Sequence, residues 1–136
     1  MTKSSNENLI VKNQYIKDLS FENPFSPQNN TSSEQPKVSI DVRLNYSDLK
    51  KNDHEIIMLM KIHTTLGEKT LYILEIQYAG VFNFKVTSDN KKEFIVECAK
   101  ILFPFVRNII SNLTRDGGFS PLLIQPFDFS NLHKNI

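Results

Sequence analysis

The sequence predicts an α+β fold, in which a four-stranded antiparallel sheet packs with one long proline-interrupted helix and a short C-terminal helix. Two observations predict this class. Segments in which apolar and polar residues alternate, the pattern of half-buried strands, come first in the chain, and their short connections favour antiparallel pairing. A long apolar segment with helical periodicity follows them. Strands followed by a helix, rather than strands alternating with helices, are typical of α+β proteins.

The length of 136 residues suits a single domain. Residues 1–8 are polar, and we expect a flexible N-terminal extension there. Residues 9–136 form the predicted domain, and residues 23–36 within it hold three prolines in a polar stretch. Such composition predicts a long irregular crossover loop between the first two strands.

Four strands are predicted, in residues 9–22, 37–46, 54–65 and 69–79. The first alternates imperfectly, whereas the other three place apolar side chains on one face, where a helix can cover them. The opposite, open face combines carboxylates with apolar residues: Asp18, Glu22, Ile57, Leu59, Leu71, Ile73 and Glu75. An apolar patch rimmed by charge is typical of a surface that binds a partner. A solvated sheet face is the alternative interpretation.

The predicted long helix, from Phe94 to Leu113, is apolar over more than half of its circumference. A helix that packs on one sheet needs an apolar arc of only about 100°. We therefore expect the surplus to meet a second subunit or a ligand. Pro104 lies inside this helix and predicts a kink or a break near residues 100–103. Gly117 and Gly118 predict its end, and Asp128 or Ser130 is expected to cap a short final helix.

Composition argues against several functions. The net charge of +1 gives no basis for nucleic-acid binding. With one cysteine, no signal-peptide pattern and no apolar stretch of about 20 residues, we expect a cytoplasmic protein that does not insert into membranes. The three histidines lack metal-ligand spacing, and His54 is expected at the surface. We therefore expect no enzyme activity, no bound metal and no cofactor.

Five segments, in order along the chain, resemble the SecB family of bacterial protein-export chaperones. They are YIKDLSFENP at 15–24, QPKVSIDV at 35–42, ILEIQYAGVF at 73–82, ILFPFVR at 101–107 and GFSPLLIQPFDF at 118–129. The resemblance implies a homotetramer built as a dimer of dimers. It also implies a holdase that uses no ATP, binds unfolded precursor proteins in apolar grooves and delivers them to the translocase motor SecA.

The resemblance also implies roles for individual residues. The positions that face SecA in the family match Asp18, Glu22, Ile73 and Glu75. The positions that line the client groove match Val38, Ile40, Val42 and Phe119. Two positions linked to tetramer assembly match Ile76 and Tyr78, and we expect the helix to add Cys98, Ile101 and Phe105 to the subunit interface. The chain departs from the family pattern at Glu34, where an aromatic residue is common.

Two other functions remain open at this point. A sheet with a central helix also builds small enzymes or carriers for apolar ligands, although the polar stripe of this helix offers only Glu93, Glu97 and Arg107. A SecB-like chaperone dedicated to a toxin–antitoxin client would carry the same sequence features as a general export chaperone.

Overall fold

The computed structural model describes residues 8–24 and 35–135. Four strands form one sheet: β1 (Ile10–Glu22), β2 (Lys37–Asp48), β3 (Asp53–Leu66) and β4 (Lys69–Asn83). Helix α1 (Lys91–Asp116) follows, and a 3-10 helix, η2 (Phe129–Asn135), comes last. The predicted α+β class is confirmed. The predicted N-terminal extension and most of the predicted crossover loop, including Glu34, lie outside the described residues.

The sheet is antiparallel, with the order β1-β4-β3-β2, so the first two strands of the chain lie at opposite edges. Tight turns join β2 to β3 and β3 to β4. Gly67, between β3 and β4, has a φ of 61°, and Lys51 and Asn52, between β2 and β3, have φ angles of 53° and 66°. Such positive angles suit the two-residue turns that match the twist of paired strands.

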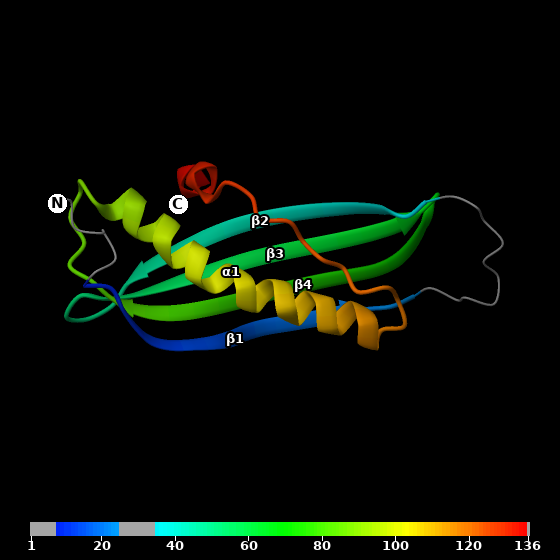
Figure 1. Ribbon diagram of the computed structural model, residues 1–136, viewed down its shortest axis with the longest axis horizontal. Coiled ribbons are helices and arrows are strands. Elements are labelled where there is room, and N and C mark those ends of the chain that lie inside the picture. Colours follow the sequence, from blue (N-terminus) through cyan, green and yellow to red (C-terminus); the bar gives the residue numbers. More distant parts are fainter. Residues whose placement is uncertain (1–7, 25–34, 136) are drawn as a thin grey trace.

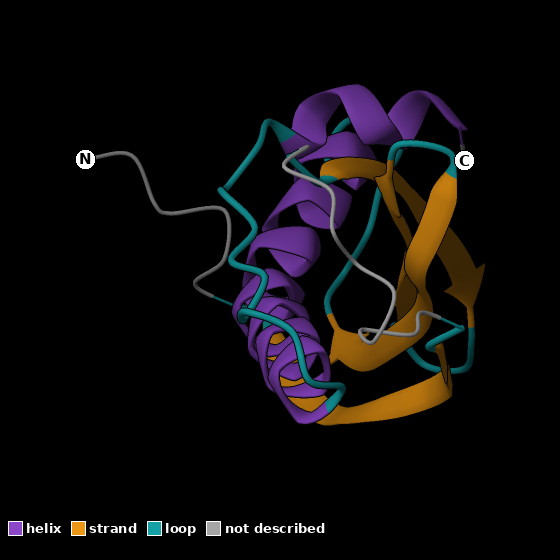
Figure 2. Ribbon diagram, turned by 90° about the vertical axis from the view of Figure 1, so that its right-hand side faces the viewer, coloured by secondary structure: helices purple, strands orange, loops and turns teal. Residues whose placement is uncertain are grey.

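The molecule has two layers, and α1 runs diagonally across one face of the sheet (Figures 1 and 2). The strand register explains which side chains the helix covers. Met58 lies opposite Tyr78 and Met60 lies opposite Ile76, and all four are buried on the helix side. The helix contributes mainly these buried residues: Phe94, Ile95, Cys98, Ala99, Leu102, Phe103, Val106 and Ile110. The core therefore lies between α1 and the even-numbered side chains of β3 and β4.

Two irregularities in β1 account for its imperfect alternation. The pairing of β1 with β4 shifts between Val11 and Asn13, and again between Ile16 and Asp18. A β-bulge places one extra residue in a strand and so reverses which face the following side chains occupy. The predicted alternation of Asp18, Ser20 and Glu22 therefore holds for the part of β1 that follows the second bulge.

Helix α1 is continuous through Pro104, so the predicted break near residues 100–103 does not occur. Proline in a helix interior costs about 3 kcal/mol, because one backbone hydrogen bond is lost and the ring crowds the carbonyl four residues earlier. Both Pro104 and Lys100, which carries that carbonyl, are exposed. Water can therefore solvate the carbonyl that proline leaves unpaired, and packing of the buried face holds the helix together.

The chain itself covers part of the apolar surplus of α1. After the helix, an extended segment, residues 118–128, returns across the helix side of the sheet and ends in η2 beside β2 (Figure 1). Phe127 and Phe129 contact Phe103 edge to face, each with ring centroids 5.4 Å away. The expectation that the whole surplus meets a subunit or ligand was therefore too broad. Phe105 remains 48% exposed.

Thr114, near the end of α1, ties this returning segment to the helix. Its buried hydroxyl donates to the carbonyl of Ile110 at 2.9 Å and accepts a hydrogen bond from the backbone N–H of Leu122 at 2.9 Å. The helix ends at Asp116 with Gly117 as its C-cap, and Gly118 has a φ of 93°, which glycine tolerates best. At the start of η2, the Asp128 carboxylate accepts from the N–H and hydroxyl of Ser130, as the capping prediction expects.

His54 is buried at 4% exposure, so the expectation of a surface histidine was wrong. Its Nε2 donates to the carbonyl of Phe84 at 2.9 Å, and its Nδ1 lies 2.8 Å from the Tyr46 hydroxyl oxygen and 3.4 Å from a carboxylate oxygen of Asp48. The imidazole also meets the ring of Phe94 at a centroid distance of 5.1 Å. Both ring nitrogens are satisfied, and the histidine joins β2, β3 and the start of α1.

We predict that two Thr→Val substitutions differ in their effect on the free energy of unfolding. Thr114→Val leaves the part-buried N–H of Leu122 without its hydrogen-bond acceptor, so it should lower the free energy of unfolding by about 1–3 kcal/mol. Thr64 is also buried, but its hydroxyl has no partner among the described residues. Thr64→Val should therefore be neutral or stabilising. Chemical denaturation of both variants tests this, and equal destabilisation by the two would contradict it.

Candidate functional site

The strand register brings the four predicted SecA-facing residues together on the open face of the sheet. Glu22 lies opposite Ile73, Ser20 lies opposite Glu75, and Asp18 lies opposite Gln77. The second β-bulge is what places Asp18 and Glu22 on the same face as Glu75. Asp18 and Glu22 are exposed, Ile73 is half-buried, and the side chain of Glu75 is 50% exposed. These residues form one continuous acidic surface over β1 and β4.

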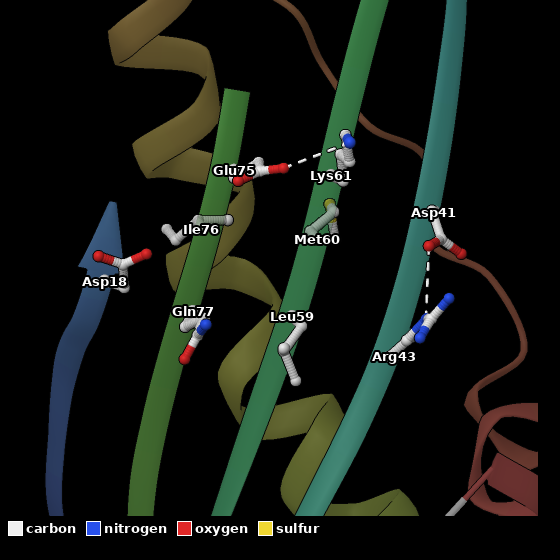
Figure 3. Close-up of a pocket in the computed structure, with 9 residues that line it drawn as sticks. All are labelled: Asp18, Asp41, Arg43, Leu59, Met60, Lys61, Glu75, Ile76 and Gln77. Carbon is white, nitrogen blue, oxygen red and sulfur yellow. Dashed lines mark ion pairs between the residues drawn. The ribbon is translucent and has the colours of Figure 1, made fainter. Parts of the chain in front are cut away.

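A shallow hollow of about 360 Å³ lies beside this acidic surface (Figure 3). It extends across all four strands, and its lining residues are Asp18, Asp41, Arg43, Leu59, Met60, Lys61, Glu75, Ile76 and Gln77. The ammonium group of Lys61 pairs with the Glu75 carboxylate at 3.4 Å, and the Arg43 guanidinium pairs with Asp41 at 3.4 Å. In contrast, Asp18 makes no ion pair within the described part of the chain.

The other end of the open face is held by a network of paired charges. Lys12 pairs with Asp53 at 2.8 Å, and Lys17 pairs with Glu55 at 3.0 Å, so two side chains of β1 reach across β4 to β3. The Tyr15 hydroxyl donates to Glu55, which lowers the pKa of that carboxyl. Burial, followed by this hydrogen bond, raises the pKa of Tyr15 to about 12. These carboxylates already have partners, unlike Asp18.

The apolar residues of the open face are less accessible than expected. Ile57 and Leu71 are 8% and 6% exposed, although neither helix of the described residues covers this side. Leu59 and Ile73 are half-buried. Long charged side chains, among them those of Arg43 and Lys61, share this face, and such side chains commonly bury their aliphatic stems along apolar surface. The open face is therefore predominantly charged, with small apolar areas at Leu59 and Ile73.

The predicted client residues lie on the helix side, near one end of the sheet. Val38 lies opposite Thr64, which lies opposite Tyr72, and the ring of Phe119 contacts Tyr72 at a centroid distance of 4.7 Å. Phe119 and Val38 are thus on the same face and at the same level of the sheet. Val38 and Ile40 are 42% and 41% exposed, whereas Val42 is half-buried. We call Val38, Ile40 and Phe119 the apolar end of the sheet.

The predicted interface residues divide into buried and exposed sets. Ile76 and Cys98 are 1% and 0% exposed in the single chain, so neither offers side-chain surface to a second subunit in this structure. Tyr78 is also mostly buried, but its ring stacks with the exposed ring of Phe105 at a centroid distance of 6.0 Å. Ile101 is half-buried.

Sequence analysis missed three exposed apolar residues of β1 on the helix side, of which Ile16 lies opposite Tyr78, the residue that stacks on Phe105. The register places Val11, Ile16 and Leu19 opposite Phe82, Tyr78 and Ile76, on the helix side of the sheet. They are 41%, 47% and 37% exposed. The bulges hide them in the sequence, because no single alternation relates all three. With Phe105 they form an apolar patch along the free edge of β1, which we call the edge patch.

Metal-ligating side chains are not brought together in the part of the chain that the structure describes. No group of three or more His, Cys, Asp and Glu side chains in the described ranges could hold a metal ion. The thiol of Cys98 is packed in the core, and burial raises its pKa. An inert packed thiol is the result. Within the described residues, no helix combines the length and the apolar character that a membrane crossing requires.

Comparison with known proteins identifies the family. The family model described as preprotein translocase subunit SecB matches residues 2–136. The protein-export protein SecB of Paramagnetospirillum magneticum is 42% identical over 129 residues, which cover 93% of this chain and 83% of that protein. The protein-export protein SecB of Orientia tsutsugamushi, strain Boryong, is 39% identical and covers 99% of this chain and 87% of its own length.

A solved structure supports the fold. A SecB-like chaperone of Mycobacterium tuberculosis, determined in complex with a peptide from an antitoxin, superposes with a TM-score of 0.73 over 88% of this chain and 90% of that one. At 9% identity this likeness concerns the fold alone. The much closer sequence relatives carry the name of protein-export proteins, so export is favoured over a dedicated toxin–antitoxin client. The chain belongs to the SecB family and is a protein-export chaperone.

Proposed function

We propose that this chain is a holdase that binds unfolded precursor proteins without using ATP, keeps them competent for translocation and delivers them to SecA. The observation that carries the proposal is the chemical difference between the two sides of one sheet. Exposed apolar side chains lie on the helix side, and exposed carboxylates lie on the open side. A chaperone with this arrangement holds a client on one side while a second protein binds the other.

The apolar end of the sheet suits clients that are unfolded. Val38 and Ile40 expose apolar surface along β2, which among the described strands pairs with β3 alone and so forms an edge of the sheet. The free backbone groups of an edge strand can bond to any extended chain, and apolar contacts add affinity without requiring one sequence. Folded proteins offer neither feature, because their apolar segments and strand edges are already buried or paired. This surface therefore favours non-native clients.

The acidic surface suits a basic partner, and the family resemblance points to SecA. Asp18, Glu22 and Glu75 are exposed, so their attraction for a basic segment acts mainly on the rate and specificity of association. Each exposed ion pair contributes only about 0.2–1 kcal/mol. Because these pairs are weak, the partner can dissociate after hand-off.

The edge patch suits assembly into a homotetramer. Val11, Ile16, Leu19 and Phe105 leave apolar side chains exposed on the helix side, three of them on a strand at the edge of the sheet, and monomeric proteins seldom leave such edges uncovered. Two or more copies that pack together through these residues would bury the apolar side chains and cover the strand edge. Several client surfaces on one assembly would also raise the affinity for a long unfolded chain.

We predict that light scattering at micromolar concentration gives a mass about four times the 15.7 kDa of the chain. Replacing Ile16 and Phe105 by Asp should reduce that mass, because a charge in the edge patch cannot be buried against a second copy. Leu49→Asp is the matched control, since Leu49 is equally exposed, at 48%, in the turn after β2. A wild-type monomer across the concentration range would refute the assembly.

We predict that the chain suppresses aggregation of a denatured, slow-folding precursor in the absence of ATP. Ile40→Asp should weaken this protection several-fold, because it places a carboxylate in the apolar end of the sheet at a residue that is already 41% exposed. Leu49→Asp again serves as the control and should protect like the wild type. If Ile40→Asp and Val38→Asp together leave protection and mass unchanged, clients bind elsewhere.

We predict that SecA binding depends on Asp18. Asp18→Asn should weaken binding mildly, since one exposed pair contributes about 0.2–1 kcal/mol, and Asp18→Arg should weaken it more because it adds repulsion. Binding should also decrease with salt, because exposed charges are screened beyond about 10 Å at 0.1 M. Calorimetric titration measures this, with Glu68→Arg in the β3–β4 turn as the control. Affinities indifferent to salt and to Asp18→Arg would show that the acidic surface is only solvated.

A further inference from the structure

We propose that the hollow on the open face is negatively charged at one end and positively charged at the other. It binds a segment of SecA that carries a basic side chain at one end and a carboxylate at the other. Lys61 is then the residue that determines specificity for the carboxylate. This inference rests on the proposed delivery to SecA and adds to it. A purely acidic surface would select any basic segment, whereas this hollow selects a segment with both charges in one order.

The charges in the hollow are distributed unevenly between its two halves. The half over β1 and β4 carries Asp18 and Glu75 and no cation, whereas the half over β3 and β2 carries Lys61 and Arg43 with one carboxylate, Asp41. Figure 3 shows the two halves side by side, with Asp18 at one margin and Arg43 at the other. The hollow is therefore negative toward β1 and positive toward β2.

The strand register arranges these residues in two neighbouring rows. One row runs Asp18, Gln77, Leu59, Arg43, and the next runs Ser20, Glu75, Lys61, Asp41. The first row has opposite charges at its ends, with a neutral amide and a half-buried leucine between them. Strands lie about 4.8 Å apart, so three strand spacings separate Asp18 from Arg43 by about 14 Å. An extended segment of about four or five residues spans that distance at roughly 3.3 Å per residue.

The size and exposure of the hollow fit such a segment. Its volume of about 360 Å³ is at the small end of the range of about 300–1,000 Å³ that ligand clefts occupy. The side chains of Lys61 and Glu75 are 58% and 50% exposed, so their ion pair is accessible and weak. A partner cation can replace Lys61 beside Glu75, and the released ammonium group, in the row next to that of Arg43, can then pair with the partner's carboxylate at the β2 end of the hollow.

Charge reversal at Lys61 separates this proposal from a purely acidic surface. Lys61→Glu makes the hollow more negative, so a partner that reads only negative charge should bind more tightly. A partner that carries a carboxylate toward β2 should instead bind at least about fivefold more weakly, because its carboxylate then meets a negative side chain in place of the Lys61 ammonium group. The measurement is calorimetric titration of full-length SecA into the intact protein, wild type and variant, at low salt.

Two controls accompany this titration. Lys61→Arg keeps the cation and should bind SecA within about twofold of the wild type. Lys50→Glu changes the net charge by the same amount in the turn after β2, outside the hollow, and should also bind like the wild type. Light scattering on every variant establishes that assembly is unchanged.

The outcomes distinguish this inference from the proposed function. Weaker binding by Lys61→Glu, together with retained binding by Lys61→Arg, supports a directional hollow. Equal or tighter binding by Lys61→Glu, with Asp18→Arg still weakening SecA, overturns the inference and leaves delivery to SecA in place. If the wild type does not bind SecA at all, the proposed function and this inference are both overturned.

Discussion

The packing of α1 on one face of the sheet is the constraint on which the rest of the structure depends. The helix covers Met58, Met60, Ile76 and their neighbours, and so makes nearly every even-numbered side chain of β3 and β4 part of the core. Strand geometry then sends the odd-numbered side chains to the opposite face. A single packing interaction thus separates an apolar side, next to the helix, from a charged side, where Lys61 and Glu75 lie.

The β-bulges of β1 adapt the edge strand to this division. Without the second bulge, the register would place Asp18 on the helix side, away from Glu75 and Gln77. The same irregular strand presents Ile16 and Leu19 toward the helix side, with Ile16 opposite Tyr78, which stacks on Phe105. One edge strand therefore contributes to the acidic surface and to the edge patch at once. The ion pairs of Lys12 and Lys17 with β3 hold this strand across its neighbour.

The segment after α1 decides how much of the helix remains available to other molecules. Phe127 and Phe129 pack against Phe103, while Phe119 packs on Tyr72 at the far end of the sheet. Thr114 anchors the segment between these contacts. The apolar end of the sheet and the edge patch are what this internal coverage leaves exposed. The proposed client and partner surfaces consequently lie on opposite faces, so the occupation of one does not block the other.

Much of the fold follows from local patterns in the sequence. Strict alternation identified β2, β3 and β4, and Gly67 and Gly117 marked a turn and the end of the helix, because side-chain periodicity and backbone freedom are properties of short segments. The same periodicity placed Glu75 and Ile73 on the open face. Residues matched by family resemblance supplied the roles proposed for them.

The burial of individual side chains and the continuity of α1 depended on contacts between residues distant in the chain. The sequence alone was therefore insufficient to predict them. His54 is buried because Tyr46, Phe84 and Phe94 surround it, and α1 passes through Pro104 because its opposite face is packed. Cys98 and Ile76 belong to the core of one chain, and Lys61 meets Glu75 only through the register of β3 with β4. The sequence by itself determined the elements and their faces. Only the tertiary structure decided which side chains those faces bury, pair or leave exposed, since each of these depends on contacts between separate elements.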